Sequence, residues 1–236
     1  MITTDFVPGS PCWLDLGAPN VGDAAAFYRA VFGWELQPMG GDVEGPGGML
    51  RQDGKTVAGL GPLTEEGARS AWMIYFSTPD AEAAAQTVQR LGGAVRVPPL
   101  DADGEGRMAP FTDPQGGQFA VWQPGATKGV EAVDEPGTLM WTELYTTDIA
   151  AAKEFYGTLF GWTTQEMPLP GGEGSYWLIA PSGLGQDRMQ GGMMEVDSDM
   201  LGQTGGRPYW HPVFHVADCD ETASRITASG GSVPMG

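Results

Sequence analysis

Two acidic residues, Asp15 and Glu143, each follow a tryptophan by two positions in a short apolar stretch. The stretches are Trp13-Leu-Asp15-Leu and Trp141-Thr-Glu143-Leu. Residues two apart in a β-strand share one face, so each strand would place an indole beside a carboxylate. Burial there raises the pKa of a carboxyl group unless a cation or hydrogen-bond donors compensate. Each acid could anchor a ligand, act as a general base towards a carbon acid, or only pair with neighbouring donors and close the structure.

The overall composition excludes several classes of partner. The net charge of −18, with only 12 Lys and Arg residues, disfavours nucleic acids and anionic membrane surfaces. The two cysteines, Cys12 and Cys219, show no spacing typical of a disulfide framework or a metal cluster. The N-terminus has no signal-peptide pattern, and no apolar stretch has the length of a membrane span. We therefore predict a cytoplasmic protein that binds neither nucleic acid nor membrane.

A helix motif that occurs twice defines the elements that position these acids. Phe27-Tyr28, followed by Phe-Gly-Trp at 32–34, recurs 128 residues later as Phe155-Tyr156 with Phe-Gly-Trp at 160–162. Asn20 or Asp23 can cap the first helix, and the glycine of each Phe-Gly-Trp can end its helix. Each helix follows a strand and precedes further short strands, which predicts repeated β-α-β-β-β units in a duplicated chain.

Four such units predict two domains of similar size. The first domain spans residues 1–123, a Gly-, Pro- and acid-rich linker spans 124–137, and the second domain spans 138–236. The second unit begins at Ala71, with its helix starting at Pro79-Asp80, and the fourth begins at Tyr209-Trp210. By comparison with the second unit, the fourth lacks its last strands, so we expect further chain beyond Gly236.

These motifs, with Asp-Pro-Gln-Gly-Gly at 113–117, resemble those of the glyoxalase/bleomycin-resistance/extradiol-dioxygenase (vicinal oxygen chelate) superfamily. The tandem form, with Gly-Arg-Met at 106–108, is similar to two-domain actinobacterial proteins labelled glyoxalase-like or hydroxylase. The resemblance implies an α+β fold of two tandem domains. In each domain, paired βαβββ units would form a half-open, cup-shaped sheet with helices on the convex face and a ligand in the hollow.

The resemblance also indicates where metal ligands would stand. The ligand position of the first strand, about fourteen residues before the Phe of each Phe-Tyr pair, falls on Trp13 and Trp141. An indole nitrogen carries a proton and has no free lone pair for a metal. The corresponding positions in the second and fourth units fall on Ile74 and Pro212, and the closing strand of the first domain offers no carboxylate at 119–122. We therefore predict no metal and no cofactor.

The two histidines leave an alternative open. His211 and His215 would face the helix layer if Pro212 and Phe214 face the cup. A shift of one residue would instead turn both histidines into the cup and restore the metal hypothesis.

Aromatic and apolar side chains are predicted to line both cups. In the first domain Trp72, Ile74, Phe76 and Trp122 would join Trp13 and Asp15, with Arg107 as the cation nearest to the acid; in the second, Tyr145, Trp210 and Phe214 would join Trp141 and Glu143. Such a lining is typical of sites for flat small molecules.

Three functions are consistent with the sequence. The first is metal-independent binding of a hydrophobic or aromatic small molecule, such as an antibiotic or another secondary metabolite, for sequestration, resistance or presentation. The second is a lyase, isomerase or oxygenase of secondary metabolism that uses Asp15 or Glu143 as the acid-base residue. The third is a regulatory protein that retains the fold without catalysis. We expect a monomer with its two domains packed together, or a homodimer.

Overall fold

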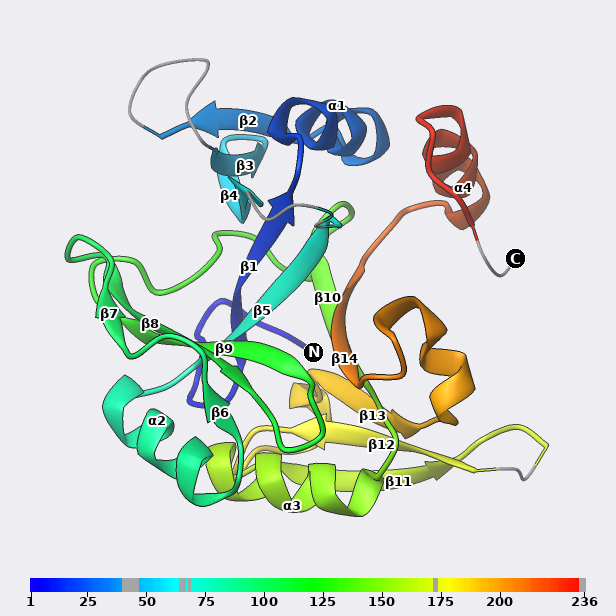
Figure 1. Ribbon diagram of the computed structural model, residues 1–236. Helices are drawn as coiled ribbons and strands as arrows, with labels where there is room; N and C mark the ends of the chain where they lie inside the picture. The colour runs from blue at the N-terminus through cyan, green and yellow to red at the C-terminus, as the bar shows by residue number, and fades with distance from the viewer. Residues whose placement is uncertain (40–46, 64–66, 68, 172–173, 234–236) are drawn as a thin grey trace. The chain divides into compact units, whose positions relative to one another are not determined.

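The computed structural model describes residues 1–39, 47–63, 67, 69–171 and 174–233 (Figure 1). In chain order the elements of the first sequence half are β1 (Pro11–Ala18), α1 (Val21–Phe32), β2 (Glu35–Pro38), β3 (Gly48–Gln52), β4 (Lys55–Pro62), β5 (Ala71–Ser77), α2 (Ala81–Arg90), β6 (Ala94–Val95), β7 (Leu100–Asp101), β8 (Gly106–Thr112) and β9 (Gln118–Pro124). Those of the second half are β10 (Leu139–Thr146), α3 (Ile149–Phe160), β11 (Thr163–Pro168), β12 (Ser175–Ala180), β13 (Gly191–Glu195), β14 (Tyr209–Phe214) and α4 (Cys219–Ala228), with short 3-10 helices at Gln186–Arg188 and Ser198–Thr204.

Contacts divide the chain into two compact units that do not coincide with the four β-α-β-β-β repeats of the sequence. We call these two the first and the second unit. The first contains Met1–Trp13, Met73–Gly129 and Met140–Val213, and the second contains Leu14–Trp72, Val130–Leu139 and Phe214–Gly236. Each unit therefore combines segments from both halves of the sequence. The domain boundaries predicted from the repeat stay a prediction.

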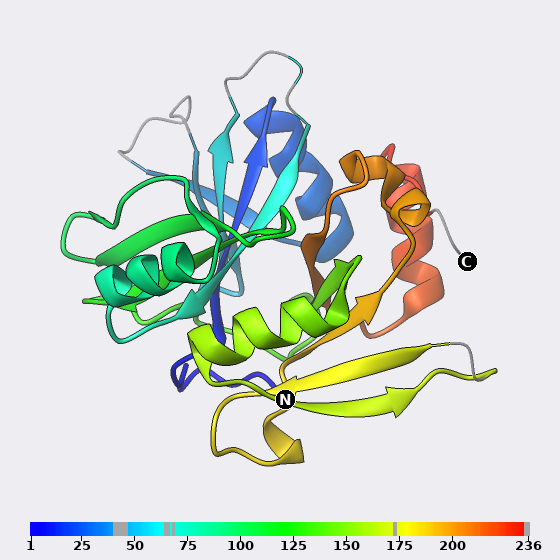
Figure 2. The ribbon, with the colours of Figure 1, turned by 60° about the horizontal axis from the view of Figure 1, so that its bottom comes forward.

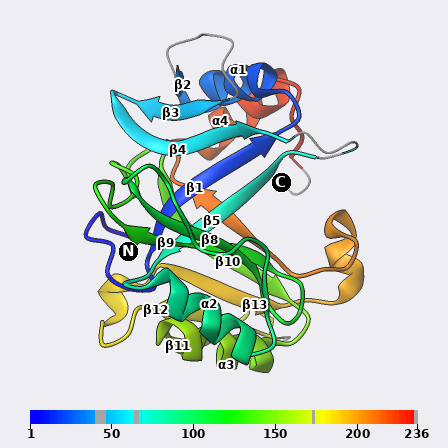
Figure 3. The ribbon, with the colours of Figure 1, turned by 60° about the vertical axis from the view of Figure 1, so that its left-hand side comes forward.

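The strands pair as the β-α-β-β-β units require. In the second unit β2, β3, β4 and β1 are neighbours in that order, with β1 parallel to β4 (Figure 3). In the first unit β5, β9, β8 and β6 follow one another, and β7 also pairs with β8. The strands of the second sequence half lie in the order β11-β12-β13-β10-β14, with β10 parallel to β13. In Figure 2 the yellow-green β11 and the yellow β12 run side by side in opposite directions.

Each of the four described α-helices follows a polar residue whose side chain accepts a backbone hydrogen bond. Asn20, Asp80, Asp148 and Asp218 each accept from the backbone N–H three residues further on. This bond satisfies one of the donors that the first helical turn leaves unpaired. The structure thus selects Asn20, and not Asp23, as the cap of α1. The four caps mark equivalent positions in the four β-α-β-β-β repeats of the sequence.

The Phe of each Phe-Tyr pair packs against the end of another helix of the same unit. A Cβ on Gly93, just after α2, would lie 3.3 Å from Cε2 of Phe155, and one on Gly231, after α4, would lie 3.0 Å from Cε2 of Phe27. In agreement, α2 contacts α3 in the first unit, and α1 contacts α4 in the second. The second glycine of each Gly-Gly pair therefore allows the close approach of an aromatic ring.

A buried polar network joins α3 to the strands in the first unit. The Tyr156 hydroxyl donates to Oδ2 of Asp113 at 2.8 Å and accepts from the Trp210 indole at 2.9 Å. Oδ1 of Asp113 accepts from the backbone N–H groups of Gln115 and Gly117. Burial raises the pKa of Asp113, while these donors act in the opposite direction. The Asp-Pro-Gln-Gly-Gly turn is thereby fixed to the helix of the second Phe-Tyr pair.

Replacing Tyr156 by Phe is expected to lower the free energy of unfolding by about 1–3 kcal/mol. The change leaves the buried Asp113 carboxyl and the Trp210 N–H each without one partner. Denaturant titration measures the loss. Tyr209→Phe, at a half-buried tyrosine outside this network, is the control and should stay within about 0.5 kcal/mol. Equal stabilities of the two variants would contradict the prediction.

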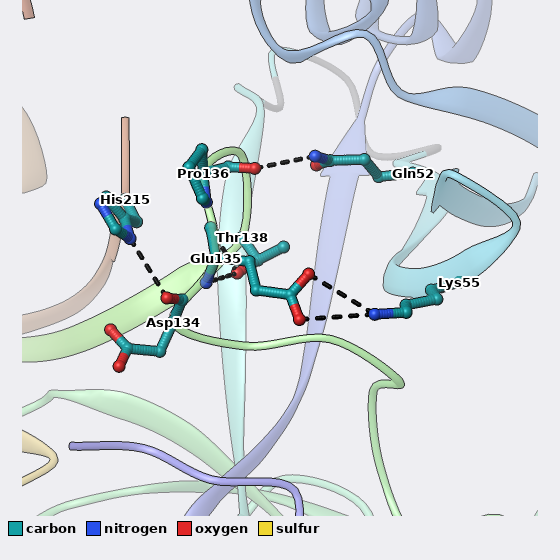
Figure 4. A network of polar contacts seen from close by, with 7 residues as sticks. All are labelled: Gln52, Lys55, Asp134, Glu135, Pro136, Thr138 and His215. Carbon is teal, nitrogen blue, oxygen red and sulfur yellow. Dashed lines mark hydrogen bonds and ion pairs between the residues drawn. The ribbon is translucent and has the colours of Figure 1, made fainter. Parts of the chain in front are cut away.

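In the second unit, residues of the predicted linker are tied to neighbouring strands (Figure 4). Glu135 pairs with Lys55 at 3.4 Å, and the Pro136 carbonyl accepts from the Gln52 amide at 2.7 Å. The Asp134 carbonyl lies 3.2 Å from Nδ1 of His215. The segment is thus held by specific hydrogen bonds along its second half.

Candidate functional site

The half-buried face of β10 carries the acid predicted from the second tryptophan. Along this strand Trp141, Glu143 and Tyr145 are half-buried, whereas Thr142 and Leu144 between them are buried. The neighbouring strand β14 turns Trp210 towards α3, where it contacts Tyr156. Trp141, Glu143 and Tyr145 therefore lie on the opposite face of the sheet, away from α3.

Both oxygens of Glu143 accept hydrogen bonds on this face. The Tyr176 hydroxyl on β12 donates to Oε1 at 2.6 Å, and Nε2 of His211 on β14 lies 2.9 Å from Oε2. The Trp141 indole N–H donates in turn to the Tyr176 oxygen at 2.7 Å. The rings of Tyr145 and Tyr209 flank His211, with centroids 4.9 and 5.6 Å from the imidazole centroid. We call these residues the Glu143 cluster: Trp141, Glu143, Tyr145, Tyr176, Tyr209 and His211.

A glycine sets the position of Tyr176 within the cluster. Gly192 on β13 lies beside Glu143 in the parallel ladder of β10 and β13. A Cβ on Gly192 would overlap Cζ, Cε1 and the hydroxyl oxygen of Tyr176. The phenol ring therefore lies directly on the backbone of Gly192. In this position its hydroxyl group crosses β13 and reaches the Glu143 carboxylate on β10.

The environment of Glu143 favours its ionised form. The hydrogen bond with His211 is the main cause that lowers the pKa of Glu143, and burial only partly opposes it. Burial raises the pKa of Tyr176, and its bond to the Glu143 carboxylate adds to this effect. The glutamate thus acts as an anionic acceptor, and Tyr176 keeps its proton as a donor.

The stabilising effect of Glu143 should depend on pH in a defined direction. Because the pKa is lowered on folding from its ordinary value of 4.5, the carboxylate stabilises the fold above that value. The effect is lost as the pH falls through the pKa of the folded state. The difference in unfolding free energy between the unchanged protein and Glu143→Gln should therefore shrink below about pH 4.5, as followed by urea titration over a pH series. A difference that grows on acidification would contradict this sign.

The structure corrects five predicted lining residues, which lie in aromatic or apolar cores. Ile74 and Phe76 are fully buried, and Phe76 packs on Phe160 of α3. Trp210 donates to Tyr156, as described above. In the second unit the Trp72 indole donates to the Tyr28 hydroxyl of α1 at 3.1 Å, and Phe214 packs on Trp72. Along β5 and β14 the predicted alternation was therefore wrong by one residue, because the side chains assigned to the cup face the helices.

The same shift changes the assignment of the histidines. His211 lies in the Glu143 cluster and not towards the helices, as predicted, while His215 lies past the end of β14 and contacts the Asp134 carbonyl. Counted seven residues back from each helix cap, the first-strand positions are Trp13, Met73, Trp141 and His211. Ile74 and Pro212 were thus the wrong counterparts.

Of these four residues, His211 has a ring nitrogen that could bind a metal ion, but few other metal-binding side chains of the described chain lie around it. Among the described residues no group of three or more His, Cys, Asp or Glu side chains is placed to hold a metal ion. His211 and Glu143 bind each other instead. The side chains of the described residues therefore do not fit the metal site of a metal-dependent enzyme.

The predicted site residues of the first half are divided between the two compact units. Trp13 stacks on Trp122 in the first unit, with ring centroids 6.5 Å apart. The guanidinium of Arg107 pairs with Glu82 of α2 at 2.9 Å, so it serves the helix layer and not the predicted carboxylate. Asp15 is half-buried on β1 in the second unit, where it is paired with Gly59 in the parallel ladder.

Sequence comparison places the chain among known proteins. Residues 13–122 match the family model described as glyoxalase-like domain, and residues 138–171 match bleomycin resistance protein-like N-terminal. The chain is 38% identical to the anthracycline biosynthesis protein DnrV of Streptomyces peucetius, over 98% of this chain and 85% of DnrV. The chain belongs to the glyoxalase/bleomycin-resistance/dioxygenase superfamily. The resemblance predicted from the Phe-Tyr and Asp-Pro-Gln-Gly-Gly motifs is confirmed.

Solved structures agree on the fold of this superfamily member. A 2,2',3-trihydroxybiphenyl 1,2-dioxygenase from Sphingomonas wittichii superposes with a TM-score of 0.65 at 14% identity, over 98% of this chain and 82% of the dioxygenase. A Mn(II)-bound glyoxalase from Novosphingobium aromaticivorans gives a TM-score of 0.63 at 17% identity, covering 97% of this chain and 73% of the glyoxalase. At these identities the likeness concerns the fold alone, and it confirms the predicted fold class.

The helices of this superfamily member do not reach the length and apolar character of a membrane span in any described part of the chain. The cytoplasmic location stays a prediction.

Proposed function

We propose that the protein binds a flat aromatic small molecule of the secondary-metabolite type at the Glu143 cluster, without a metal. The observation that carries the proposal is the cluster itself, in which four half-buried aromatic rings and one hydrogen-bonded carboxylate lie together on one face of a sheet. Sites for small molecules combine such an apolar lining with a few fixed polar groups. The name of the relative DnrV agrees with this ligand class, because an anthracycline is a fused-ring aromatic compound.

The second half of the chain is the better candidate of the two. In the first half Met73 stands where the second has His211, and the described strand β3, Gly48–Gln52, contains no tyrosine to match Tyr176 of β12. Asp15 thus has the position of Glu143 in the repeat, but the described residues that correspond to His211 and Tyr176 are not a histidine and a tyrosine in the first half. We place the binding site in the second half and assign no ligand to the first.

An enzymatic role with Glu143 as general base is the weaker alternative. A general base works best when its pKa lies near the working pH. The pKa of Glu143 is lowered, and both of its oxygens already accept hydrogen bonds. These features suit an acceptor that orients its neighbours better than one that removes a proton from a ligand.

Calorimetric titration with 2-naphthol, a flat two-ring phenol, tests the binding proposal. Trp141→Ala should weaken binding about three- to tenfold, since it removes one aromatic contact and the N–H that positions Tyr176. Trp13→Ala, at the equivalent position of the first half, is the matched control and should leave the affinity unchanged. Binding that is insensitive to Trp141→Ala, or reduced only by Trp13→Ala, would exclude the Glu143 cluster as the site.

A further inference from the structure

His211 has one ring nitrogen that no group of the described chain satisfies. Nε2 lies 2.9 Å from the Glu143 carboxylate, whereas Nδ1 is buried and has no hydrogen-bond partner. A buried polar atom without a partner costs about 1–3 kcal/mol, and such atoms are rare in folded proteins. The free nitrogen is therefore a specific feature of the cluster that a ligand could complete.

The contact with Glu143 decides which kind of partner Nδ1 needs. An ionised carboxylate only accepts hydrogen bonds, so Nε2 must carry the proton that it donates to Oε2. In the neutral imidazole Nδ1 then holds a lone pair and is an acceptor. A doubly protonated ring would instead turn Nδ1 into a buried N–H donor. The neutral form, with Nδ1 as acceptor, is the form in which the ring can receive a hydrogen bond from a ligand.

We infer that Nδ1 of His211 accepts a hydrogen bond from a hydroxyl group of the ligand, so the site selects phenols over aromatic molecules without a donor. The inference rests on the proposed function and names the ligand class of that site. Because Nδ1 is buried, a neighbouring side chain must move aside for the hydroxyl to reach the nitrogen; the flanking rings of Tyr145 and Tyr209 are only half-buried. Glu143 is then a positioning residue that fixes the protonation of His211.

Three ligands of one shape separate donor from acceptor recognition. At neutral pH 2-naphthol offers a donor, 2-methoxynaphthalene offers only an acceptor, and 2-methylnaphthalene offers neither. Calorimetry should give 2-naphthol at least tenfold higher affinity than the other two, which should bind alike. Equal affinity of the naphthol and its methyl ether would overturn the inference, because Nδ1 would then not act as an acceptor. If none of the three binds, the proposed function itself fails.

Two variants assign the preference to the residue. His211→Leu should bind 2-naphthol no better than 2-methylnaphthalene and keep its affinity for the latter within about threefold, which also shows that the variant is folded. His215→Leu changes the other of the chain's two histidines and should keep the full preference. A preference that survives in His211→Leu overturns the inference. Should His211→Leu not fold, the three ligands on the unchanged protein decide alone.

Discussion

The Glu143→Gln variant is expected to bind 2-naphthol at least tenfold more weakly than the unchanged protein. The carboxylate offers one oxygen to Tyr176 and the other to His211. An amide has a single oxygen, so one of these two donors must face an NH2 group or lose its partner. Hydrogen bonds to charged groups contribute about 1.5–3 kcal/mol, which corresponds to about a ten- to hundredfold change in affinity if the bond shapes the site.

Asp15→Asn is the matched control for this change. It replaces the corresponding acid of the first half by its amide and should alter the affinity by less than about twofold.

Nitrogen-15 NMR of the imidazole ring provides an independent measurement, because only two histidines contribute signals. The His211 ring should show one protonated and one unprotonated nitrogen in the unchanged protein, and Glu143→Gln should change that pattern. Unaltered affinity together with an unaltered ring signal would contradict the role of Glu143.

The repeat and its caps made most of the fold predictable. The strand-helix order follows from apolar periodicity, and the stops at Gly33 and Gly161 follow from the left-handed conformation that glycine adopts there. The face of β10 was also predictable, because Trp141 and Glu143 alternate with buried residues along one strand. These features depend on local sequence alone, and so a single chain suffices to see them.

The error along β5 and β14 shows where local sequence gives too little information. Both strands are aromatic on both faces, as in Tyr209-Trp210-His211, so hydrophobic alternation alone does not fix which face is buried. The helix caps carry the missing signal. Asp80 and Asp218 correspond to Asn20, and the same count of seven residues back from each cap would have placed His211 opposite the helices.

The remaining members of the cluster could not be predicted from local patterns. Tyr176 lies 33 residues from Glu143 in the sequence, and it reaches the carboxylate only because β12 and β10 are both neighbours of β13. Strand order of this kind is decided by long-range pairing, not by the residues of one strand. The Gly191-Gly192 sequence is likewise typical of a turn but lies in strand β13. The reason for a glycine at position 192 is the Tyr176 ring that packs against it.

Gly192→Ala is the second change for which we expect a large effect. Gly192 has a backbone conformation open to other residues, so the variant meets no backbone strain. Its methyl group would occupy the space of the Tyr176 ring, and that overlap should cost about 1–3 kcal/mol of unfolding free energy. Displacement of Tyr176 also breaks its hydrogen bond to Glu143, and the affinity for 2-naphthol should fall about tenfold or more.

A double-mutant cycle distinguishes this mechanism from general damage to β13. The three atoms nearest to the added Cβ all belong to Tyr176, so Tyr176→Ala removes these three contacts. In the Tyr176→Ala background the effect of Gly192→Ala on the free energy of unfolding should change sign. The substitution should then stabilise the protein by about 0.4–1 kcal/mol, because alanine loses less backbone entropy than glycine on folding. If Gly192→Ala destabilises both backgrounds equally, the glycine serves the strand itself. The reversal of sign would instead show that Gly192 is needed to hold the Tyr176 ring beside Glu143.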